Sequence, residues 1–385
     1  MTSASSEADT DHFNLNVKTL MIVLMVLSPL RQIAMVFDLN KCMGCQTCSV
    51  ACKMLWTRQP GEEHQWWCTV NTQPGLGTPK GWEQMGGGYA ANGKPVLGHL
   101  PTANEFGGGW QFNQEEVFFG GKGRSVHLAP RANADREPTG APNGEPRWGP
   151  NWDEDQGGGV YPNSYYFYLP RLCNHCTRPV CVEVCPTKAM YKRREDGIVL
   201  RNEDICRGSG ACMRACPYKK IYFNYVTNVA QHCIMCFPRL EQGIAPACAR
   251  QCPGRLVFVG YLDDTDGPIH KLVNEWGVAL PLHPEYSTEP NVFYVPPLSP
   301  HRLNEDRSID YTTPRIPPDY LESLFGPKVH AALDNLRSEL AAVRAGGQSE
   351  ILHTLIVYKW QDLFGPFTKP PTQIHAAAKT PEVSA

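Results

Sequence analysis

CNHCTRPVCVEVCP, at residues 173–186, and CRGSGACMRACP, at residues 206–217, are the stretches that decide the fold of this 385-residue chain. The first spaces its cysteines by two, four and three residues, and the second by five and three. Two more groups lie on either side: Cys42-x2-Cys45-x2-Cys48-x3-Cys52 and Cys233-x2-Cys236-x11-Cys248-x3-Cys252. The four groups contain fifteen of the sixteen cysteines, and Cys68 stands alone. Each group ends with two cysteines four positions apart, which the period of an α-helix places on one face.

This spacing is typical of iron–sulfur proteins. Three closely spaced cysteines followed by a fourth form the bacterial ferredoxin signature, in which the fourth cysteine ligates the other cluster of a pair. Soft thiolates suit such clusters, which spread one electron over several irons. Disulfides and zinc are the alternatives, but four-cysteine zinc sites usually use two separated pairs rather than three ligands in one loop. The sequence therefore predicts four iron–sulfur clusters, and a zinc-stapled scaffold protein is the alternative from another class.

The exchange of fourth ligands assigns each cysteine to a cluster. The first group pairs with the fourth, and the second pairs with the third. The expected [4Fe–4S] ligand sets are Cys42, Cys45, Cys48 and Cys252; Cys52, Cys233, Cys236 and Cys248; and Cys173, Cys176, Cys181 and Cys216. The last set is Cys185, Cys206 and Cys212, with Ser209 at the vacant position. Three thiolates favour a [3Fe–4S] cluster, and ligation of a fourth iron by a Ser209 alkoxide is the alternative.

Several residues beside the ligands have a predicted part in the chemistry. Cys68 is expected to be a buried apolar thiol. His175 and His232 adjoin ligands and are expected to donate hydrogen bonds near the sulfurs. Three basic residues either offset the negative charge of the clusters or are simply solvated: Arg207, Lys219 and Lys220. No catalytic residue is expected, because the chain shows no P-loop, dinucleotide fingerprint or Ser/His/Asp constellation.

Composition excludes some functions and compartments. The net charge is −2, so there is no electrostatic case for nucleic acid. Gly and Pro number 34 each, which predicts many loops. The longest apolar run, Leu20–Leu27, is far shorter than the ~20 residues that cross a membrane. Residues 1–30 are expected to be a disordered extension or an overcalled start without an export signal. We therefore expect a peripheral protein with no transmembrane segment of its own.

The remaining pattern predicts an α+β fold of two pseudo-symmetric double-cluster ferredoxin-like modules. Residues 31–65 and 168–262 form the four-cluster core, in which strands are expected at 31–40, 198–200, 220–224 and 256–259. Residues 66–167 are a long Gly- and Trp-rich insertion, expected to be a folded, irregular surface that serves either for docking or as a plain structural insertion. Residues 263–385 are a C-terminal extension with proline-rich extended arms around 294–297 and 314–318. A tail helix is expected from about Pro327 to Ala345.

Three segments resemble a known family closely: CRGSGACMRACPYKKIYFN at 206–224, CNHCTRPVCVEVCPTKAMYKR at 173–193 and HCIMCFPRLEQG at 232–243. They are similar to the beta subunits of the complex iron–sulfur molybdoenzymes. WWCTVNTQPG at 66–75, GPNWDEDQGGG at 149–159 and PNSYYFYLPR at 162–171 resemble the type II branch of the dimethyl sulfoxide reductase family. That branch contains dehydrogenases of ethylbenzene, steroid side chains and dimethyl sulfide, nitrate reductase, nitrite oxidoreductase, and selenate, chlorate and perchlorate reductases. The resemblance spans about residues 31–366.

The resemblance implies that this chain relays single electrons between a molybdopterin-containing catalytic alpha subunit and a haem b gamma subunit. The cluster of Cys42 would face the catalytic subunit, and the three-cysteine cluster would face the haem. Relatives with nitrate reductase activity carry Trp where this chain has Ser209, so a non-cysteine residue there fits the family. The resemblance favours a periplasmic dehydrogenase exported with a signal-bearing partner, with the cytoplasmic face of the inner membrane as the alternative. The substrate and the direction of the reaction lie outside this chain.

Overall fold

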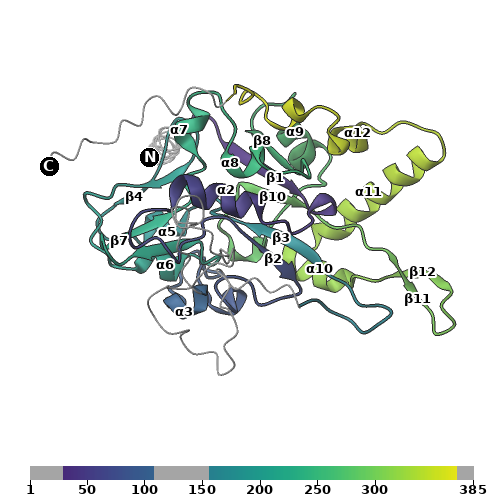
Figure 1. Ribbon diagram of the computed structural model, residues 1–385, viewed down its shortest axis with the longest axis horizontal. Coiled ribbons are helices and arrows are strands. Elements are labelled where there is room, and N and C mark those ends of the chain that lie inside the picture. The colour runs from purple at the N-terminus through teal and green to yellow at the C-terminus, as the bar shows by residue number, and fades with distance from the viewer. Residues whose placement is uncertain (1–28, 108–155, 371–385) are drawn as a thin grey trace, which may run out of the picture.

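The computed structural model describes residues 29–107 and 156–370 (Figure 1). Residues 1–28 of the predicted extension at 1–30 lie outside the described residues, as do Trp110, Trp148 and Trp152 of the insertion and everything after residue 370. The fold mixes short helices with small sheets. No helix of the described part combines the length and apolar character needed to span a bilayer.

A four-stranded sheet with the order β8-β1-β10-β9 forms the centre of the molecule. β1 (Ile33–Asp38) is buried along its whole length, as its continuous apolar run IAMVF requires of a strand covered on both faces. It pairs antiparallel with β8 (Val257–Tyr261) and parallel with β10 (Val292–Val295). β9 (Leu280–Pro281) completes the sheet. The predicted strands at 31–40 and 256–259 are confirmed.

β10 corrects one expectation. The proline-rich stretch around 294–297 was expected to form an extended arm, but Val292–Val295 is a fully buried strand hydrogen-bonded beside β1. A parallel pairing between segments so far apart in sequence leaves no local signal, because VFYV followed by two prolines fits an exposed arm equally well. The C-terminal extension therefore supplies part of the central core.

Four short helices carry the cysteines. They are α2 (Thr47–Trp56), α5 (Val180–Glu183), α6 (Ala211–Ala215) and α8 (Ala247–Arg250). α2 packs against α8, and α5 packs against α6 (Figure 1). A helix between the third and fourth cysteine of each group is thus confirmed.

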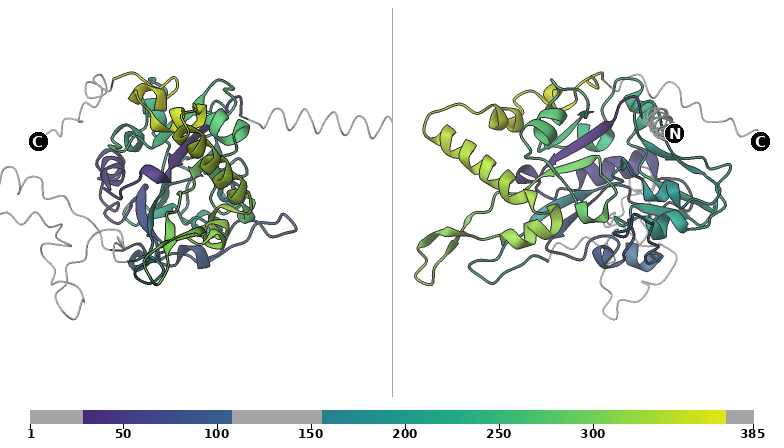
Figure 2. Two further views of the ribbon diagram at one scale, coloured as in Figure 1. Left: turned by 90° about the vertical axis from the view of Figure 1, so that its right-hand side faces the viewer. Right: turned by 180° about the vertical axis from the view of Figure 1, so that it is seen from behind.

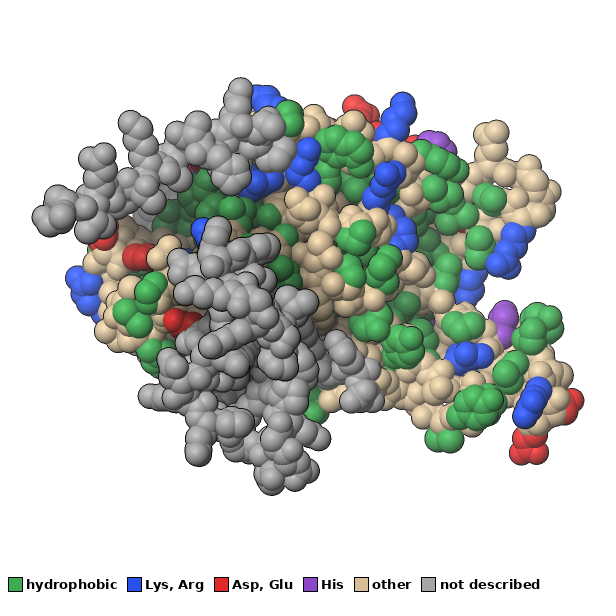
Figure 3. Space-filling model, in the orientation of Figure 1, with side chains coloured by type: hydrophobic (Ala, Val, Ile, Leu, Met, Phe, Trp, Pro, Cys, Tyr) green, Lys and Arg blue, Asp and Glu red, His purple; other side chains and the backbone are tan. Residues whose placement is uncertain are grey.

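Four two-stranded antiparallel sheets accompany the central sheet. They are β2 (Thr69–Gln73) with β3 (Phe167–Arg171), β4 (Met190–Lys192) with β5 (Val199–Arg201), β6 (Ile221–Asn224) with β7 (Val229–His232), and β11 (His301–Leu303) with β12 (Ile309–Pro314). The strands predicted at 198–200 and 220–224 are confirmed as β5 and β6. The hairpin β11–β12 projects from the end of the molecule opposite α5 and α6, and carries both charged and apolar side chains (Figures 2 and 3).

The C-terminal helices lie on the side of the central sheet away from α5 and α6 (Figure 1). They are α10 (Pro318–Phe325), α11 (Lys328–Arg344) and α12 (Glu350–Ile356), and the tail helix predicted from Pro327 to Ala345 is confirmed as α11. Its apolar stripe of Val329, Ala332, Leu333 and Leu336 is buried. The short elements that remain are α3 (Ala103–Phe106), α7 (Phe237–Leu240), α9 (Pro268–His270), the π-helix Lys271–Glu275 and four 3-10 helices: Leu39–Lys41, Trp82–Gln84, Pro284–Tyr286 and Trp360–Leu363.

The described part of the insertion is more deeply packed than its composition indicates. Trp66, Trp67 and Trp82 were expected on an irregular surface, but their side chains are buried. Trp67 and Trp82 belong to a large hydrophobic core around the central sheet. A second, much smaller core lies between α5, α6 and their hairpins; its buried residues are Cys185, Ala189, Met190, Val199, Cys212, Met213, Ile221 and Ala230.

Candidate iron–sulfur centres

Three cavities are each lined by four cysteines of the spaced groups, drawn from distant parts of the chain. Cavity one is lined by Cys42, Cys45, Cys48 and Cys252; cavity two by Cys52, Cys233, Cys236 and Cys248; and cavity three by Cys173, Cys176, Cys181 and Cys216. The remaining thiols, Cys185, Cys206 and Cys212, lie near enough for their charges to interact, and we call them the three-thiol site. The structure thus brings together the same sets that the spacing predicts. Among the described residues, no three His, Cys, Asp or Glu side chains are arranged to hold a single metal ion.

Each cysteine helix serves two neighbouring sites. α2 carries Cys48 to cavity one and, one turn later, Cys52 to cavity two. α8 carries Cys248 to cavity two, and Cys252 follows it into cavity one. α5 and α6 divide their cysteines between cavity three and the three-thiol site in the same way. The i, i+4 spacing makes this possible, because it separates the two thiols by about 6 Å along one face.

The loop after the first cysteine has the same backbone form in all four groups. The residue two positions later is left-handed each time: Gly44, His175, Gly208 and Met235, with φ of 67°, 42°, 65° and 52°. In three of the groups this residue turns its amide N–H toward the first cysteine's sulfur, as Met235 N does to Cys233 Sγ at 3.4 Å. Position 44 also requires glycine for a steric reason, because a Cβ there would lie 2.5 Å from the Tyr168 ring. The curled loops therefore present N–H donors to the thiols.

Most of the buried thiols are costly to ionise in the protein alone, although hydrogen bonds lower the pKa of Cys48 and of Cys185. Burial, with a smaller contribution from neighbouring thiols, raises the pKa of Cys42 and of Cys212 to about 12. Metal ligands must be deprotonated, so only a strongly cationic group inside each cavity would hold these thiolates together. Hydrogen bonds to the sulfurs would stabilise thiolates that bind such a group, and Trp56 Nε1 donates one to Cys236 Sγ at 3.0 Å. The donor set thus matches an iron–sulfur cluster.

Consecutive sites are neighbours in space. The charge of Cys48, in cavity one, acts on Cys52 and Cys248 in cavity two. Cys233 of cavity two acts on Cys173 of cavity three. Cys212 of the three-thiol site acts on Cys181 of cavity three. The sites therefore follow one another in the order one, two, three and the three-thiol site.

Cys68 lies closer to the predicted ligands than the sequence indicates. It is buried, with 1% of its surface exposed, as expected. It also lines cavity two and is hydrogen-bonded to Cys48 of cavity one. A lone cysteine outside the spaced groups gives no local signal of this position.

The two histidines differ in what they offer a cluster. His175 Nδ1 accepts the N–H of Val199 at 3.1 Å, so its proton sits on Nε2, a buried donor without an acceptor among the described residues. His232 Nδ1 donates to the Cys233 carbonyl at 2.7 Å, which leaves its buried Nε2 without a proton in the neutral ring. Burial lowers the pKa of His232 to about 3, so the ring is neutral. His175 therefore fits the expected role of donor, and His232 anchors the backbone instead.

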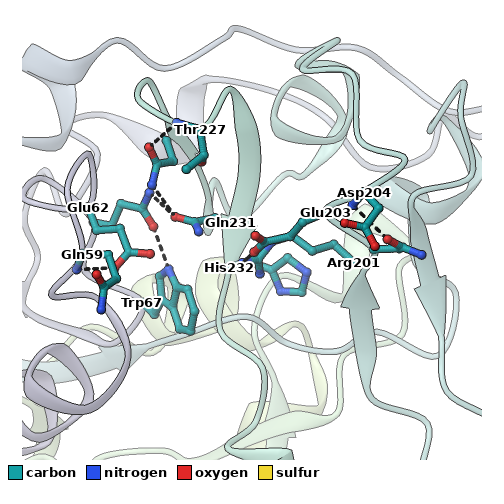
Figure 4. Close-up of polar contacts among 12 residues, drawn as sticks. Gln59, Glu62, Trp67, Arg201, Glu203, Asp204, Thr227, Gln231 and His232 are labelled. Carbon is teal, nitrogen blue, oxygen red and sulfur yellow. Dashed lines mark hydrogen bonds and ion pairs between the residues drawn. The ribbon is translucent and has the colours of Figure 1, made fainter. Parts of the chain in front are cut away.

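Strand β7 positions the residues just before Cys233. Gln231 and His232 face opposite sides of the strand, as the pleat requires (Figure 4). Gln231 accepts from Gln65 at 2.8 Å, and Gln65 in turn accepts from Trp67, which lines cavity two. His232 lies on the side of Arg201 and lines cavity three (Figure 4). One strand end therefore forms part of the wall between cavities two and three.

The basic residues and Ser209 are placed as follows. Lys219 and Lys220 are buried rather than solvated, whereas Arg207 is exposed. Ser209 is exposed, and its hydroxyl accepts the N–H of Ala211, at the start of α6, at 3.5 Å. The fourth position of the three-thiol site is thus occupied by a small residue on the surface.

These features define the class of protein: a chain with a ferredoxin-like 4Fe–4S dicluster domain, and residues 164–262 match the family of that description. The chain is 50% identical to selenate reductase subunit beta of Thauera selenatis, over 87% of this chain and 99% of that protein. It is 49% identical to dimethylsulfide dehydrogenase subunit beta of Rhodovulum sulfidophilum, over 87% and 98%, and 52% identical to respiratory nitrate reductase subunit beta of Haloferax mediterranei, over 84% and 90%. The chain therefore belongs to the beta subunits of the type II dimethyl sulfoxide reductase family, the iron–sulfur electron-transfer subunits of molybdenum oxidoreductase complexes.

Proposed function

We propose that the chain carries three [4Fe–4S] clusters, in cavities one, two and three, and one [3Fe–4S] cluster in the three-thiol site. The observation that carries this proposal is the convergence of the four thiol sets, each assembled from two cysteine groups. Their neighbourhood in one order supports a relay in which each cluster accepts one electron and passes it on. We also propose that cavities one and two, and cavity three with the three-thiol site, are two pseudo-symmetric modules.

The protein's own groups would do three things in this relay. The thiolates hold each cluster, which when bound supplies reversible one-electron chemistry. N–H donors such as Gly44 and Trp56 stabilise the negative charge that arrives on the sulfurs. The apolar walls of cavity two, including Trp67 and Met235, keep water away from its thiols. Small reorganisation of such a dry, prearranged site favours rapid electron transfer.

We propose that electrons pass between a molybdopterin catalytic subunit at cavity one and a haem b subunit at the three-thiol site. Exposure supports contact at the first end, because Cys45 is exposed and Met43 beside it is 60% exposed. At the other end, Ile205 and Tyr191 are 41% and 42% exposed. Residues 66–167 are proposed to help docking, which Val160 and Tyr161 support with 81% and 83% of their surfaces exposed.

The particular complex is the finest part of the proposal. We favour a periplasmic dehydrogenase of the ethylbenzene, steroid side-chain or dimethyl sulfide type, exported with its catalytic partner. Relatives named as reductases and as a dehydrogenase are almost equally similar, so a nitrate, selenate or (per)chlorate reductase or a nitrite oxidoreductase is the second candidate. Fractionation of the native host, with detection in the periplasm or on the cytoplasmic face of the membrane, tests the compartment.

The decisive experiment is iron analysis combined with low-temperature EPR of the purified protein. We expect about fifteen irons per chain, a near-isotropic [3Fe–4S] signal when oxidised and [4Fe–4S] signals on reduction. A colourless protein that contains zinc and no iron would establish the scaffold alternative. A fourth [4Fe–4S] signal without the three-iron signal would show that Ser209 or water completes the last site.

A further inference from the structure

Two cations are buried close together in the interior. Lys220 and Arg171 each expose 1% of their surface. Lys220 Nζ donates to three uncharged oxygens: Trp66 O at 3.1 Å, Thr69 Oγ1 at 3.2 Å and Tyr222 OH at 3.0 Å. Arg171 donates to the Thr78 and Tyr218 carbonyls, and its guanidinium lies 3.4 Å from the centre of the Trp82 ring. In the described part of the chain, neither forms an ion pair with a carboxylate.

This arrangement is unfavourable in the protein alone. Each cation loses its hydration, and the charge of Arg171 acts directly against that of Lys220. Hydrogen bonds to neutral oxygens satisfy Lys220 Nζ and the two terminal nitrogens of Arg171, but they leave the net charge uncompensated. A stable fold therefore requires negative charge close by.

The only candidates near Lys220 in the described structure are the thiol sites. Lys220 lines cavity three, and its charge also acts on Cys52 and Cys233 of cavity two. The charge of Arg171 acts on the Glu83 carboxylate and on Cys216 of cavity three, so Lys220 is the cation that depends on the thiol sites. A [4Fe–4S] cluster with four thiolates is a net anion, and it becomes more negative when reduced. Lys220 thus lies between two sites where this charge would change.

We propose that Lys220 is the shared counter-charge of the second and third clusters and holds both at a higher reduction potential than their thiolates alone would give. The inference rests on the proposed presence of clusters in cavities two and three. When one electron leaves the second cluster and enters the third, one unit of negative charge moves from one side of Lys220 to the other. The positive charge of Lys220 would stabilise the reduced form on either side.

The test is a redox titration, followed by EPR, of the iron-loaded complex. Lys220→Gln keeps a hydrogen-bond donor and removes the charge. The equilibrium constant for one-electron reduction should therefore fall about tenfold at the second cluster and at the third, which lowers each reduction potential by about 59 mV. Lys220→Arg should restore both potentials. Lys219→Gln is the matched control: Lys219 is equally buried, but it donates to His99 O and Arg214 O, and among the described thiols its charge acts on Cys216. It should leave the second cluster unchanged.

Each outcome decides the matter. Unchanged potentials in a fully loaded Lys220→Gln variant would overturn the inference, and so would equal shifts in Lys220→Gln and Lys220→Arg, because both would deny a role for charge. If Lys220→Gln fails to assemble clusters while Lys220→Arg assembles them, the counter-charge is needed for loading and the inference stands; failure of both would overturn it. Absence of cluster signals from the unaltered protein would instead reject the proposed function.

Discussion

The two halves of the relay use one local design on unequal foundations. The first half comprises cavities one and two with α2 and α8, and it lies in the large core that contains β1, β8 and β10. The second half comprises cavity three and the three-thiol site with α5 and α6, and much of it rests on the small core between two hairpins. Helices α5 and α6 span only four and five residues, whereas the first half combines the four-residue α8 with the ten-residue α2. Such short helices are not stable by themselves.

The difference teaches what metal contributes to each half. A buried sheet with a continuous apolar core stabilises the first half whether or not iron is bound. In the second half, two of the eight residues in the small core are themselves cysteines of the three-thiol site, Cys185 and Cys212. Metal–thiolate bonds must therefore replace much of the missing apolar contact there.

Removal of iron should give the largest effect and separate the halves. After chelation under reducing conditions, we expect amide exchange in α5, α6 and the β4–β5 hairpin to accelerate at least about a hundredfold, ~2.7 kcal/mol of lost protection. The amides of β1 and β10 should remain protected, because their ladder lies in the large core. Hydrogen exchange read by mass spectrometry measures both. Equal loss of protection in the two halves would refute the comparison.

Removal of single thiols should distinguish a complete site from a three-thiol site. Cys52→Ala, in the first half, should cost about four irons per chain, and Cys185→Ala, in the second, about three. The matched control is Cys68→Ala, which removes a thiol that lines cavity two but belongs to no predicted ligand set. It should retain all of its iron in a colorimetric assay. If Cys68→Ala lost a cluster as Cys52→Ala does, the ligand assignment in cavity two would be wrong.

Ser209→Cys should make the second half resemble the first. A fourth thiol in the loop between Cys206 and Cys212 should convert the three-iron cluster to four irons, a gain of about one iron per chain. The near-isotropic EPR signal of the oxidised protein should disappear. Ser209→Ala serves as the control, and it should leave that signal unchanged. A changed signal in Ser209→Ala would show that the serine hydroxyl is a ligand.

Removal of the hydrogen bonds made by His283, beside the second half, should give the smallest effect. Burial lowers the pKa of His283, but hydrogen bonds to Glu285 at 2.7 Å and Glu83 at 3.2 Å outweigh burial. The pKa of His283 is therefore raised above its ordinary value. A raised folded pKa stabilises the fold at low pH, so this contribution is complete below about pH 6.5 and is lost as the pH rises through the folded value. His283→Gln should cost about 1 kcal/mol at pH 6 and little at pH 9.

Thermal unfolding at the two pH values measures this contribution. The ring of His283 also stacks on Tyr286, with centroids 4.9 Å apart, and Gln cannot reproduce that contact. A constant loss at both pH values would therefore assign the stabilisation to stacking rather than to charge.

Local features were predictable from the sequence, and distant pairings were not. The thiols that spacing groups together do lie together, because a helix turn and a curled loop determine where neighbouring cysteines point. The strand before Cys42 and the tail helix at Lys328–Arg344 were also readable, since each has a clear apolar pattern. The entry of β10 beside β1 was missed, because nothing within Val292–Val295 names its partner.

The residues around the sites show the same limit. Lys220 could be read as solvated or as a counter-charge, and only the packing of Trp66 and Tyr222 around it decides that it is buried. The two histidines look alike beside their cysteines, but different backbone partners give them opposite tautomers. Both distinctions depend on contacts between residues far apart in the chain.

The sharing of each cysteine helix between two sites has a consequence for how such a chain can change over generations. A site of this kind cannot be deleted cleanly: losing cavity two would leave Cys52 and Cys248 as idle thiols on α2 and α8, which cavity one still needs for Cys48 and for the placement of Cys252. Idle thiols invite oxidation and wrong metals. A mutation that spares both neighbours must therefore fall in a loop, and Ser209 is a loop residue. The last site of the proposed relay can therefore lose a single iron far more readily than an inner site can lose its whole cluster.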